Sequence, residues 1–177
     1  DGKREAAYIG ENFLIGQNRV ILEPRTLAKL LDALNINNDE LVLDIGMGLG
    51  YSSAVISLLA EVVIGVEDDS SLASEAEEIL SEIGVDNVVV QVSKLEDGAP
   101  EHGPYDVIIL QGGVEEIPGS IINQLKDGGR VGAIYIEEGL GTAKIGFKLN
   151  DKINWRYSFN AAAPVLPGFF KQKNFVL

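Results

Sequence analysis

Short apolar runs alternate with segments of helical period along most of this chain, and this alternation constrains the fold more than any other feature of the sequence. Five segments have the length and β-branched content of buried strands: 41–45, 62–66, 88–92, 105–110 and 130–136. Helical patterns precede or separate them at 24–34, 51–60, 70–82, with Ser70 or Ser71 as the N-cap, and 118–125. Repeated strand and helix units require a parallel sheet with helices on both faces.

The pattern changes after Glu138. Residues 142–149 and 153–159 are strand-like, and Asn150-Asp151-Lys152 between them is typical of a hairpin turn. The sequence therefore predicts a doubly wound α/β fold with an antiparallel edge. A length of 177 residues predicts one domain spanning 1–177. Because the chain starts at Asp1 and its sole Met is Met47, we expect that a preceding N-terminal segment has been removed.

Composition excludes several classes of function. The chain has no Cys and one His, so thiolate chemistry and Cys-ligated metals are excluded, and we expect no metal site. Fourteen basic against 27 acidic residues give a net charge of −13, which disfavours nucleic acid and anionic lipid as partners. No apolar run is long enough to span a bilayer, and no signal peptide is visible. A cytoplasmic protein is the expectation.

The segment joining the first sheet strand to its helix carries the most specific pattern. It reads Asp44-Ile-Gly46-Met-Gly48-Leu-Gly50-Tyr51, with glycines at alternate positions. Glycine permits a sharp turn and lets a ligand approach the backbone closely. The third glycine comes one residue earlier than in the dinucleotide fingerprint, which disfavours NAD or FAD. Asp44 beside the loop would repel phosphate but suits a cationic or hydrogen-bond-donating ligand, and an aminoacyl sulfonium fits better.

A second acidic residue supports a binding site at this loop. Glu67 ends the next strand, 21 residues after Gly46, and about 20 residues is the usual separation between a glycine loop and a ribose-binding acid. Asp68 and Asp69 are alternatives for this role. The structural alternative is that the glycines form only a tight turn and that Glu67 is a solvated strand end. The combination of loop and acids favours an adenosine site.

These residues resemble the class I S-adenosylmethionine-dependent methyltransferases, and more closely the protein-L-isoaspartate O-methyltransferase family. The similarity covers about residues 8–177, and its most specific stretch runs from Pro104-Tyr105-Asp106 through Glu116-Ile117-Pro118 to Gly128-Gly129. The resemblance implies a Rossmann-like sheet of seven strands with an antiparallel C-terminal hairpin. It also implies S-adenosylmethionine as cofactor and transfer of its methyl group to a carboxylate of a damaged protein or peptide, a repair activity.

The resemblance also implies which residues contact the cofactor. The expected set is Asp44, Gly46, Met47, Gly48, Gly50, Tyr51, Glu67, Asp68, Leu95 and Gln111. We expect Asp44 near the methionine end of the cofactor, Glu67 on the ribose hydroxyls, and Leu95 and Gln111 beside the adenine or methionine portion. No catalytic residue is assigned, because a substrate carboxylate is already ionised at neutral pH and needs no general base.

Two loops depart from the family pattern. In the segment 16–24, Leu22 stands where the family has a hydroxyl residue near the transferred methyl group. After the strand 88–92, the chain reads Ser93-Lys94-Leu95 where the family has G-D-G. These departures support an alternative interpretation, in which the chain is a non-catalytic or regulatory member that has kept the fold.

Overall fold

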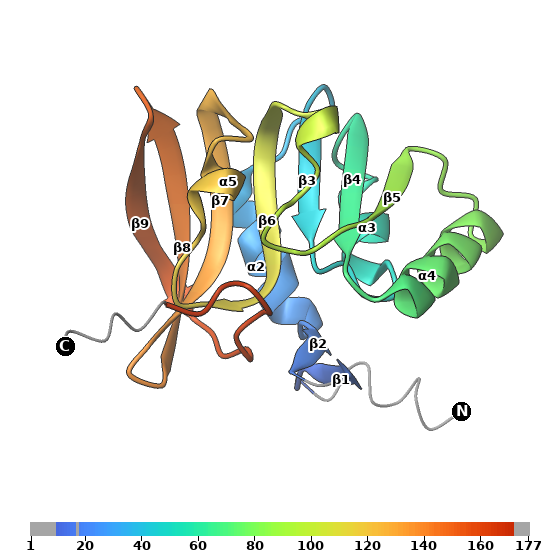
Figure 1. Ribbon diagram of the computed structural model, residues 1–177, viewed down its shortest axis with the longest axis horizontal. Helices are drawn as coiled ribbons and strands as arrows, with labels where there is room; N and C mark the ends of the chain where they lie inside the picture. The colour runs from blue at the N-terminus through green and yellow to red at the C-terminus, as the bar shows by residue number, and fades with distance from the viewer. Residues whose placement is uncertain (1–9, 17, 172–177) are drawn as a thin grey trace.

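A seven-stranded sheet forms the centre of the molecule (Figure 1). The computed structural model describes residues 10–16 and 18–171. The strand order is β5-β4-β3-β6-β7-β8-β9, and β1 and β2 form a separate two-stranded sheet. The strands are β1 (Phe13–Gly16), β2 (Arg19–Ile21), β3 (Leu41–Ile45), β4 (Val62–Glu67), β5 (Val88–Val92), β6 (Tyr105–Val114), β7 (Leu125–Glu137), β8 (Leu140–Leu149) and β9 (Lys152–Asn160). The helices are α2 (Pro24–Leu34), α3 (Tyr51–Ile56), α4 (Ser70–Glu82) and α5 (Gly119–Ile122), with a 3-10 turn, η1, at Pro100–His102.

The strand directions confirm the predicted fold class. Strands β3 to β7 pair in parallel, whereas β8 and β9 pair antiparallel to their neighbours. The predicted turn between β8 and β9 is correct, because Asn150 and Asp151 both have left-handed φ angles, of 51° and 59°. Two such residues between paired strands match a type I′ turn, and residues with short polar side chains tolerate these angles best.

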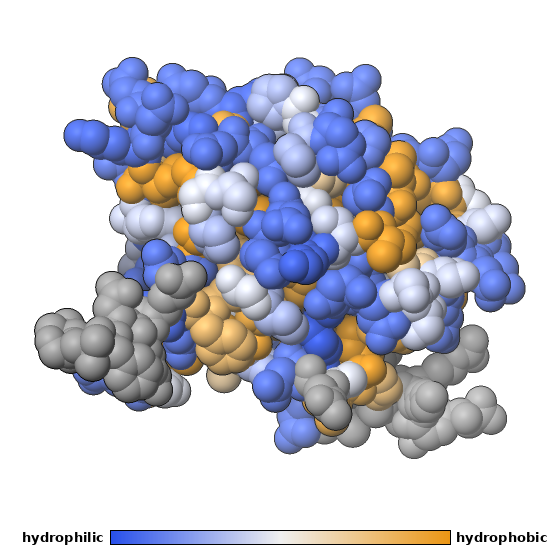
Figure 2. All heavy atoms as spheres, in the orientation of Figure 1, coloured by the Kyte–Doolittle hydropathy of each residue, from blue (hydrophilic) through white to orange (hydrophobic). Residues whose placement is uncertain are grey.

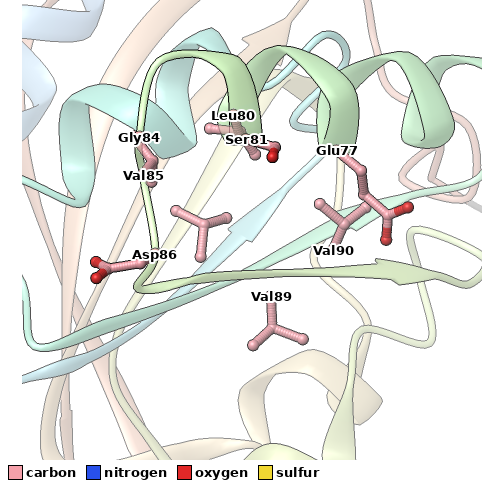
Figure 3. A pocket seen from close by; sticks show the side chains of 9 residues that line it. Glu77, Leu80, Ser81, Gly84, Val85, Asp86, Val89 and Val90 are labelled. Carbon is pink, nitrogen blue, oxygen red and sulfur yellow. The ribbon is translucent and has the colours of Figure 1, made fainter.

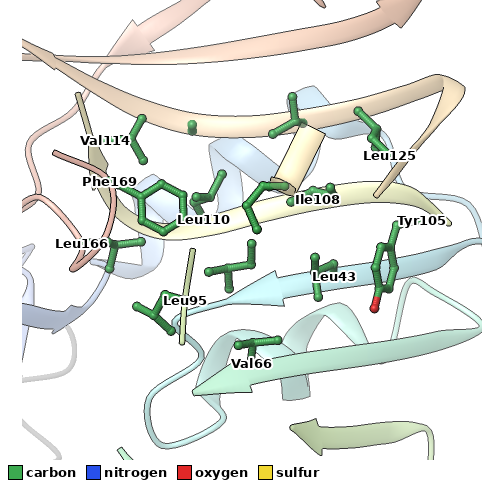
Figure 4. Packing of buried hydrophobic residues seen from close by; sticks show 14 of the residues in the cluster. Leu43, Val66, Leu95, Tyr105, Ile108, Leu110, Val114, Leu125, Leu166 and Phe169 are labelled. Carbon is green, nitrogen blue, oxygen red and sulfur yellow. The ribbon is translucent and has the colours of Figure 1, made fainter. Parts of the chain in front are cut away.

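The two faces of the sheet are covered in different ways. One face packs on helices α2 and α3, and its buried side chains include Leu30, Leu34 and Val63. The other face carries only η1 and the single turn α5, so the predicted helices cover this face much less than the first. Loop and C-terminal side chains cover it instead, among them Leu95 and Phe169 (Figure 4).

Several segment boundaries also differ from the sequence prediction. The helix expected at 118–125 is only α5, because β7 already begins at Leu125, and the helix expected at 51–60 ends at Ile56. The N-cap of α4 is Asp69 rather than Ser70 or Ser71, since the Asp69 carboxylate accepts hydrogen bonds from the N–H groups of Ser71 and Leu72. The carboxylate is ionised and therefore the stronger acceptor at the positive end of the helix.

Strand β6 extends beyond the end of its neighbour β3, and there it is hydrogen-bonded to a C-terminal segment of the chain. Residues 110–112 form an irregularity in its pairing with β7. Past this point, Gly113 donates a hydrogen bond to the carbonyl of Pro164 at 2.7 Å and accepts one from the N–H of Leu166 at 2.9 Å. The C-terminal segment 164–169 therefore continues the sheet where β3 has ended, next to the loop between β3 and α3.

Hydrophilic residues dominate the face drawn in Figure 2, and hydrophobic residues interrupt it in separate patches. One patch on the right lies over β5, where Val89 is 43% exposed on the face opposite α4. No helix within residues 10–16 and 18–171 is long and apolar enough to cross a membrane.

Candidate functional site

The glycine loop lies at the carboxyl end of β3, where chain topology favours a ligand site. The sheet order reverses between β3 and β6, and open α/β sheets bind ligands at such a point. Gly46 and Gly48 have φ angles of 81° and 56°, in the left-handed region that glycine adopts at no steric cost. The loop is fixed to the neighbouring strand because the N–H groups of Gly46 and Met47 donate to the carbonyl of Val66, at 2.8 and 3.2 Å.

Asp44 braces this loop from inside the protein. Its buried carboxylate accepts hydrogen bonds from the hydroxyls of Ser52 and Ser53 and from the side-chain amide of Gln111, each at 2.6 Å. Burial raises the pKa of Asp44, and the three hydrogen bonds oppose that rise. The structure thus brings two residues of the predicted set, Asp44 and Gln111, into contact. A contact between either residue and a cofactor stays a prediction.

The sequence analysis did not single out Ser52 and Ser53. Their signal is a pair of hydroxyl residues at the second and third positions of α3, directly after the glycine loop. Hydroxyls at a helix start can turn back toward the preceding strand, and here they anchor α3 to the end of β3 through Asp44. The two serines therefore help to hold the loop in shape.

Glu67 meets the glycine loop as predicted, because β4 lies beside β3 in the sheet. Its side chain is fully buried, so the alternative of a solvated strand end is wrong. The Oε2 atom accepts a hydrogen bond from the N–H of Gly48 at 2.8 Å, and Oε1 accepts from the N–H groups of Asp68 and Asp69 at 3.1 Å each. This cluster of donors around one carboxylate forms the centre of the candidate site.

The main partner of Glu67 is a residue that the sequence analysis did not assign to the site. Arg19 of β2 donates from Nη1 to Oε1 of Glu67 at 2.9 Å and from Nη2 to Oε2 at 2.6 Å. Its Nη1 also contacts Oδ1 of Asp68 at 2.6 Å. The available signal was a lone arginine directly before the apolar residues Val20, Ile21 and Leu22 in an acidic chain.

The charges in this cluster shift one another's protonation. Burial alone would raise the pKa of Glu67, but the hydrogen bond and charge of Arg19 outweigh it and lower that pKa. The pKa of Asp68 is raised, first by burial and then by the neighbouring Glu67 carboxylate. Glu67 is therefore the ionised partner of Arg19, in keeping with the bidentate geometry.

The side chains of the remaining predicted residues point away from the loop backbone or lie at its margin. Met47 packs its side chain on Ala76 of α4, and Leu95 is buried in the core of the opposite face. Tyr51 is 40% exposed at the start of α3. Leu22 lies with Gly46, Gln111 and Tyr51 around a cavity of about 10 Å³, and its place near the transferred methyl group stays a prediction. Gln17, in the same segment, lies outside the described residues.

A larger hollow elsewhere contains none of the predicted site residues. It has a volume of about 490 Å³ and lies between α4 and β5, with Val85 and Val90 among its apolar lining residues (Figure 3). Its lining includes two carboxylates, Glu77 and Asp86, and no basic side chain among the described residues. Within the described ranges, no three His, Asp or Glu side chains are grouped to hold a metal ion.

Comparison with known proteins identifies the family. A sequence model of the protein-L-isoaspartate(D-aspartate) O-methyltransferases matches residues 2–154. A protein-L-isoaspartate O-methyltransferase of Syntrophus aciditrophicus is 34% identical over 151 residues, which are 83% of this chain and 69% of that protein. This chain belongs to the protein-L-isoaspartate(D-aspartate) O-methyltransferase family.

Solved structures share the fold of this methyltransferase family member. One protein-L-isoaspartate O-methyltransferase structure matches with a TM-score of 0.80 and 26% identity over 88% of this chain and 51% of its own. A Plasmodium falciparum structure, solved with S-adenosyl-L-homocysteine, matches with a TM-score of 0.75 and 20% identity over 90% of this chain and 81% of its own. The chain spans only 60% and 55% of two further curated relatives.

Proposed function

We propose that this chain is an S-adenosylmethionine-dependent O-methyltransferase that methylates a carboxylate of a damaged, isoaspartyl-containing protein or peptide. The single observation that carries the proposal is the joining of the glycine loop to Glu67 at the carboxyl ends of β3 and β4, in a chain of this family. The proposal treats residues 1–177 as one domain. The absence of Cys supports a cytoplasmic location.

The polar groups of the site fit an adenosyl cofactor, although the described conformation leaves little space for one. Two carboxylate oxygens at Glu67 suit the two hydroxyls of a ribose. The backbone of Gly46 and Gly48 suits a closely approaching ligand, since neither residue has a Cβ. Arg19 of this same chain now takes up both oxygens of Glu67, so cofactor binding requires that this side chain move.

When bound, S-adenosylmethionine supplies an electrophilic methyl group, and the protein's task is to align it with the acceptor. An ionised carboxylate needs no proton removed before it attacks, in agreement with a site that contains no His. Positioning of reactants alone can contribute about 7 kcal/mol or more to lowering a barrier. Asp44 and Gln111 hold the loop for this purpose, and Leu22 supplies part of the apolar lining of the adjoining cavity.

Two measurements test the proposal together. Calorimetric titration with S-adenosylhomocysteine should give saturable binding, whereas NADH should give none. Methyl transfer from labelled S-adenosylmethionine should occur to an isoaspartyl peptide and not to the aspartyl peptide of the same sequence. Binding of S-adenosylhomocysteine without methyl transfer would support the proposed cofactor but reject the proposed isoaspartyl substrate. Silence in both assays would reject the proposal and favour the non-catalytic alternative, which Leu22 and Lys94 support.

A further inference from the structure

Arg19 holds Glu67 in the way that a cofactor's sugar would hold it. An arginine directs two N–H donors at one carboxylate, and a ribose directs two O–H donors at the same pair of oxygens. The distances of 2.6 and 2.9 Å show that both oxygens of Glu67 are already engaged. Backbone N–H groups of Gly48 and Asp69 take further acceptor positions. Glu67 therefore has no free position for a ribose while Arg19 is in place.

A second side chain from the same part of the chain covers the glycine loop. A Cβ added to Gly48 would lie 2.5 Å from Cδ1 of Ile15, so this β1 side chain lies directly on the backbone that a ligand would contact. On Gly46, a Cβ would meet Nη2 of Arg19 at 3.4 Å. Strands β1 and β2 thus close the sugar site with one arginine and the loop with one isoleucine.

The attachment of β1 to the rest of the molecule is weak. The two strands pair through only three residue positions, and a two-stranded sheet of this size has little stability of its own. The β1 side chains Phe13 and Leu14 are 37% and 68% exposed. The described side-chain anchor at its start is Asn12, which donates to the carbonyl of Ala162 and accepts from the N–H of Glu23.

The structure offers space into which the Arg19 side chain can move. A hollow of about 700 Å³ lies between β1 and the start of α4, and its lining includes Ile15, Arg19 and Asp68. The Asp68 side chain remains 31% exposed, so it can keep Nη1 of Arg19 while Glu67 is released. The Nε atom of Arg19 is buried and makes no hydrogen bond with any described residue. With Arg19 paired to Glu67, one of its hydrogen-bond donors is therefore without a partner among the described residues.

We propose that Arg19 is an internal competitor for the ribose site, and that cofactor binding displaces it from Glu67 together with strand β1. This inference rests on the proposed function, since it concerns the cofactor of that same site. It assigns a regulatory role to the arginine. The observed affinity for the cofactor equals the intrinsic affinity of the open site multiplied by the fraction of molecules in which Arg19 has left Glu67.

The test compares Arg19→Met with Arg130→Met by calorimetric titration with S-adenosylhomocysteine. Arg130 is the matched control, because it also forms a bidentate pair with a glutamate, Glu40, outside this site. Loss of the competitor should lower Kd by at least about tenfold in Arg19→Met, equivalent to about 1.4 kcal/mol, and Arg130→Met should stay near the wild type. Thermal unfolding checks that each variant is folded.

Unchanged or weaker binding in Arg19→Met would overturn the inference. If the wild type still methylates the isoaspartyl peptide in that case, the proposed function stands and only the role of Arg19 is rejected. If neither protein binds S-adenosylhomocysteine and no methyl is transferred, both proposals fail.

A second measurement uses the unmodified protein, in case Arg19→Met does not fold. Saturating S-adenosylhomocysteine should speed hydrogen exchange at the amides of residues 13–16 and slow it at residues 46–50. A ligand ordinarily slows exchange where it binds, so slower exchange in both segments would show that β1 closes over the cofactor and would overturn the displacement.

Discussion

Two arginines of this protein each hold a glutamate in a bidentate pair, and they do so at opposite ends of the same sheet. Arg130 pairs with Glu40 at the amino ends of the strands, and Arg19 pairs with Glu67 at the carboxyl ends. Every nitrogen of the Arg130 guanidinium is satisfied, since it also donates to the carbonyls of Leu34 at 2.6 Å and Asn35 at 3.1 Å.

The difference lies in what each pair is joined to. Arg130 joins the C-terminal carbonyls of α2 to the sheet, which is a structural role. Arg19 comes from β2, which pairs with the weakly attached strand β1, leaves Nε unpartnered, and lies where the fold binds ligands. An arginine whose donors all have hydrogen-bond partners holds elements together, whereas an arginine with an unpaired donor at a ligand site can exchange its partner.

The largest effect should come from Glu67→Gln. This change leaves the buried Arg19 with only Asp68 as a charged partner, and removing one member of a buried ion pair typically costs about 3–5 kcal/mol. We expect a loss of stability in that range by urea unfolding, and a loss of S-adenosylhomocysteine binding by calorimetry. Retained binding in a folded variant would separate Glu67 from the ribose site.

Glu40→Gln is the counterpart at the structural pair and should cost about 2 kcal/mol, the usual contribution of hydrogen bonds to a charged group, while leaving cofactor affinity unchanged. A hydrogen bond from Arg130 lowers the pKa of Glu40 from 4.5 to about 2. Because the folded pKa is depressed, the advantage of the wild type is fully present above pH 4.5 and is lost as the pH falls toward 2. Urea unfolding of both proteins from pH 7 to pH 2.5 checks this. A difference that is constant with pH would contradict it.

Gly46→Val tests the loop, and Gly128→Val is its control because the two glycines have nearly the same φ angle. Gly46 and Gly128 have φ angles of 81° and 82°, and a side chain in this region costs about 1–2 kcal/mol. A Cβ on Gly128 meets no atom within 4 Å, whereas one on Gly46 approaches Arg19 and Leu166. Both valine variants should lose stability, but only Gly46→Val should lose S-adenosylhomocysteine binding. Equal affinity in the two variants would place the site elsewhere.

Lys126→Ala should have the smallest effect. Lys126 contacts both carboxylate oxygens of Asp106 at 2.8 Å, but its side chain is 42% exposed. Exposed pairs contribute about 1 kcal/mol or less, and salt screens them. Unfolding measured at low and high salt should show a small difference that shrinks further at high salt. A loss as large as that of Glu40→Gln would mean that exposure does not separate these pairs.

Most of the sheet could be predicted from local patterns. Helix 24–34 and strands 41–45 and 88–92 have the predicted bounds, because leucine spacing and β-branched runs report directly on burial. The helical cover of one face was overestimated, because the helix predicted at 118–125 is only α5, and 93–104, with two glycines and two prolines, holds no α-helix. The wrong expectation came from extending a repeating pattern over a segment that does not follow it.

The candidate site was predictable only in part. The meeting of the glycine loop with Glu67 follows from parallel pairing of adjacent strands, which a sequence reports. The pairing of Arg19 with Glu67 joins residues 48 positions apart through a strand outside the main sheet. No local periodicity indicates such a contact. The available signal was a single arginine directly before a run of apolar residues in an acidic chain.

The pairing of β6 with residues 164–169 has a consequence for how the chain assembles during translation. Every strand of the sheet precedes this segment in the chain, so a ribosome makes the sheet before it makes Leu166 and Phe169. Until then, Gly113 presents an unpaired N–H and carbonyl at an open strand edge, where nascent chains can associate. The contact of Leu166 beside Gly46 thus forms only after the sheet has been made, and a partly synthesised chain would have the sheet without it.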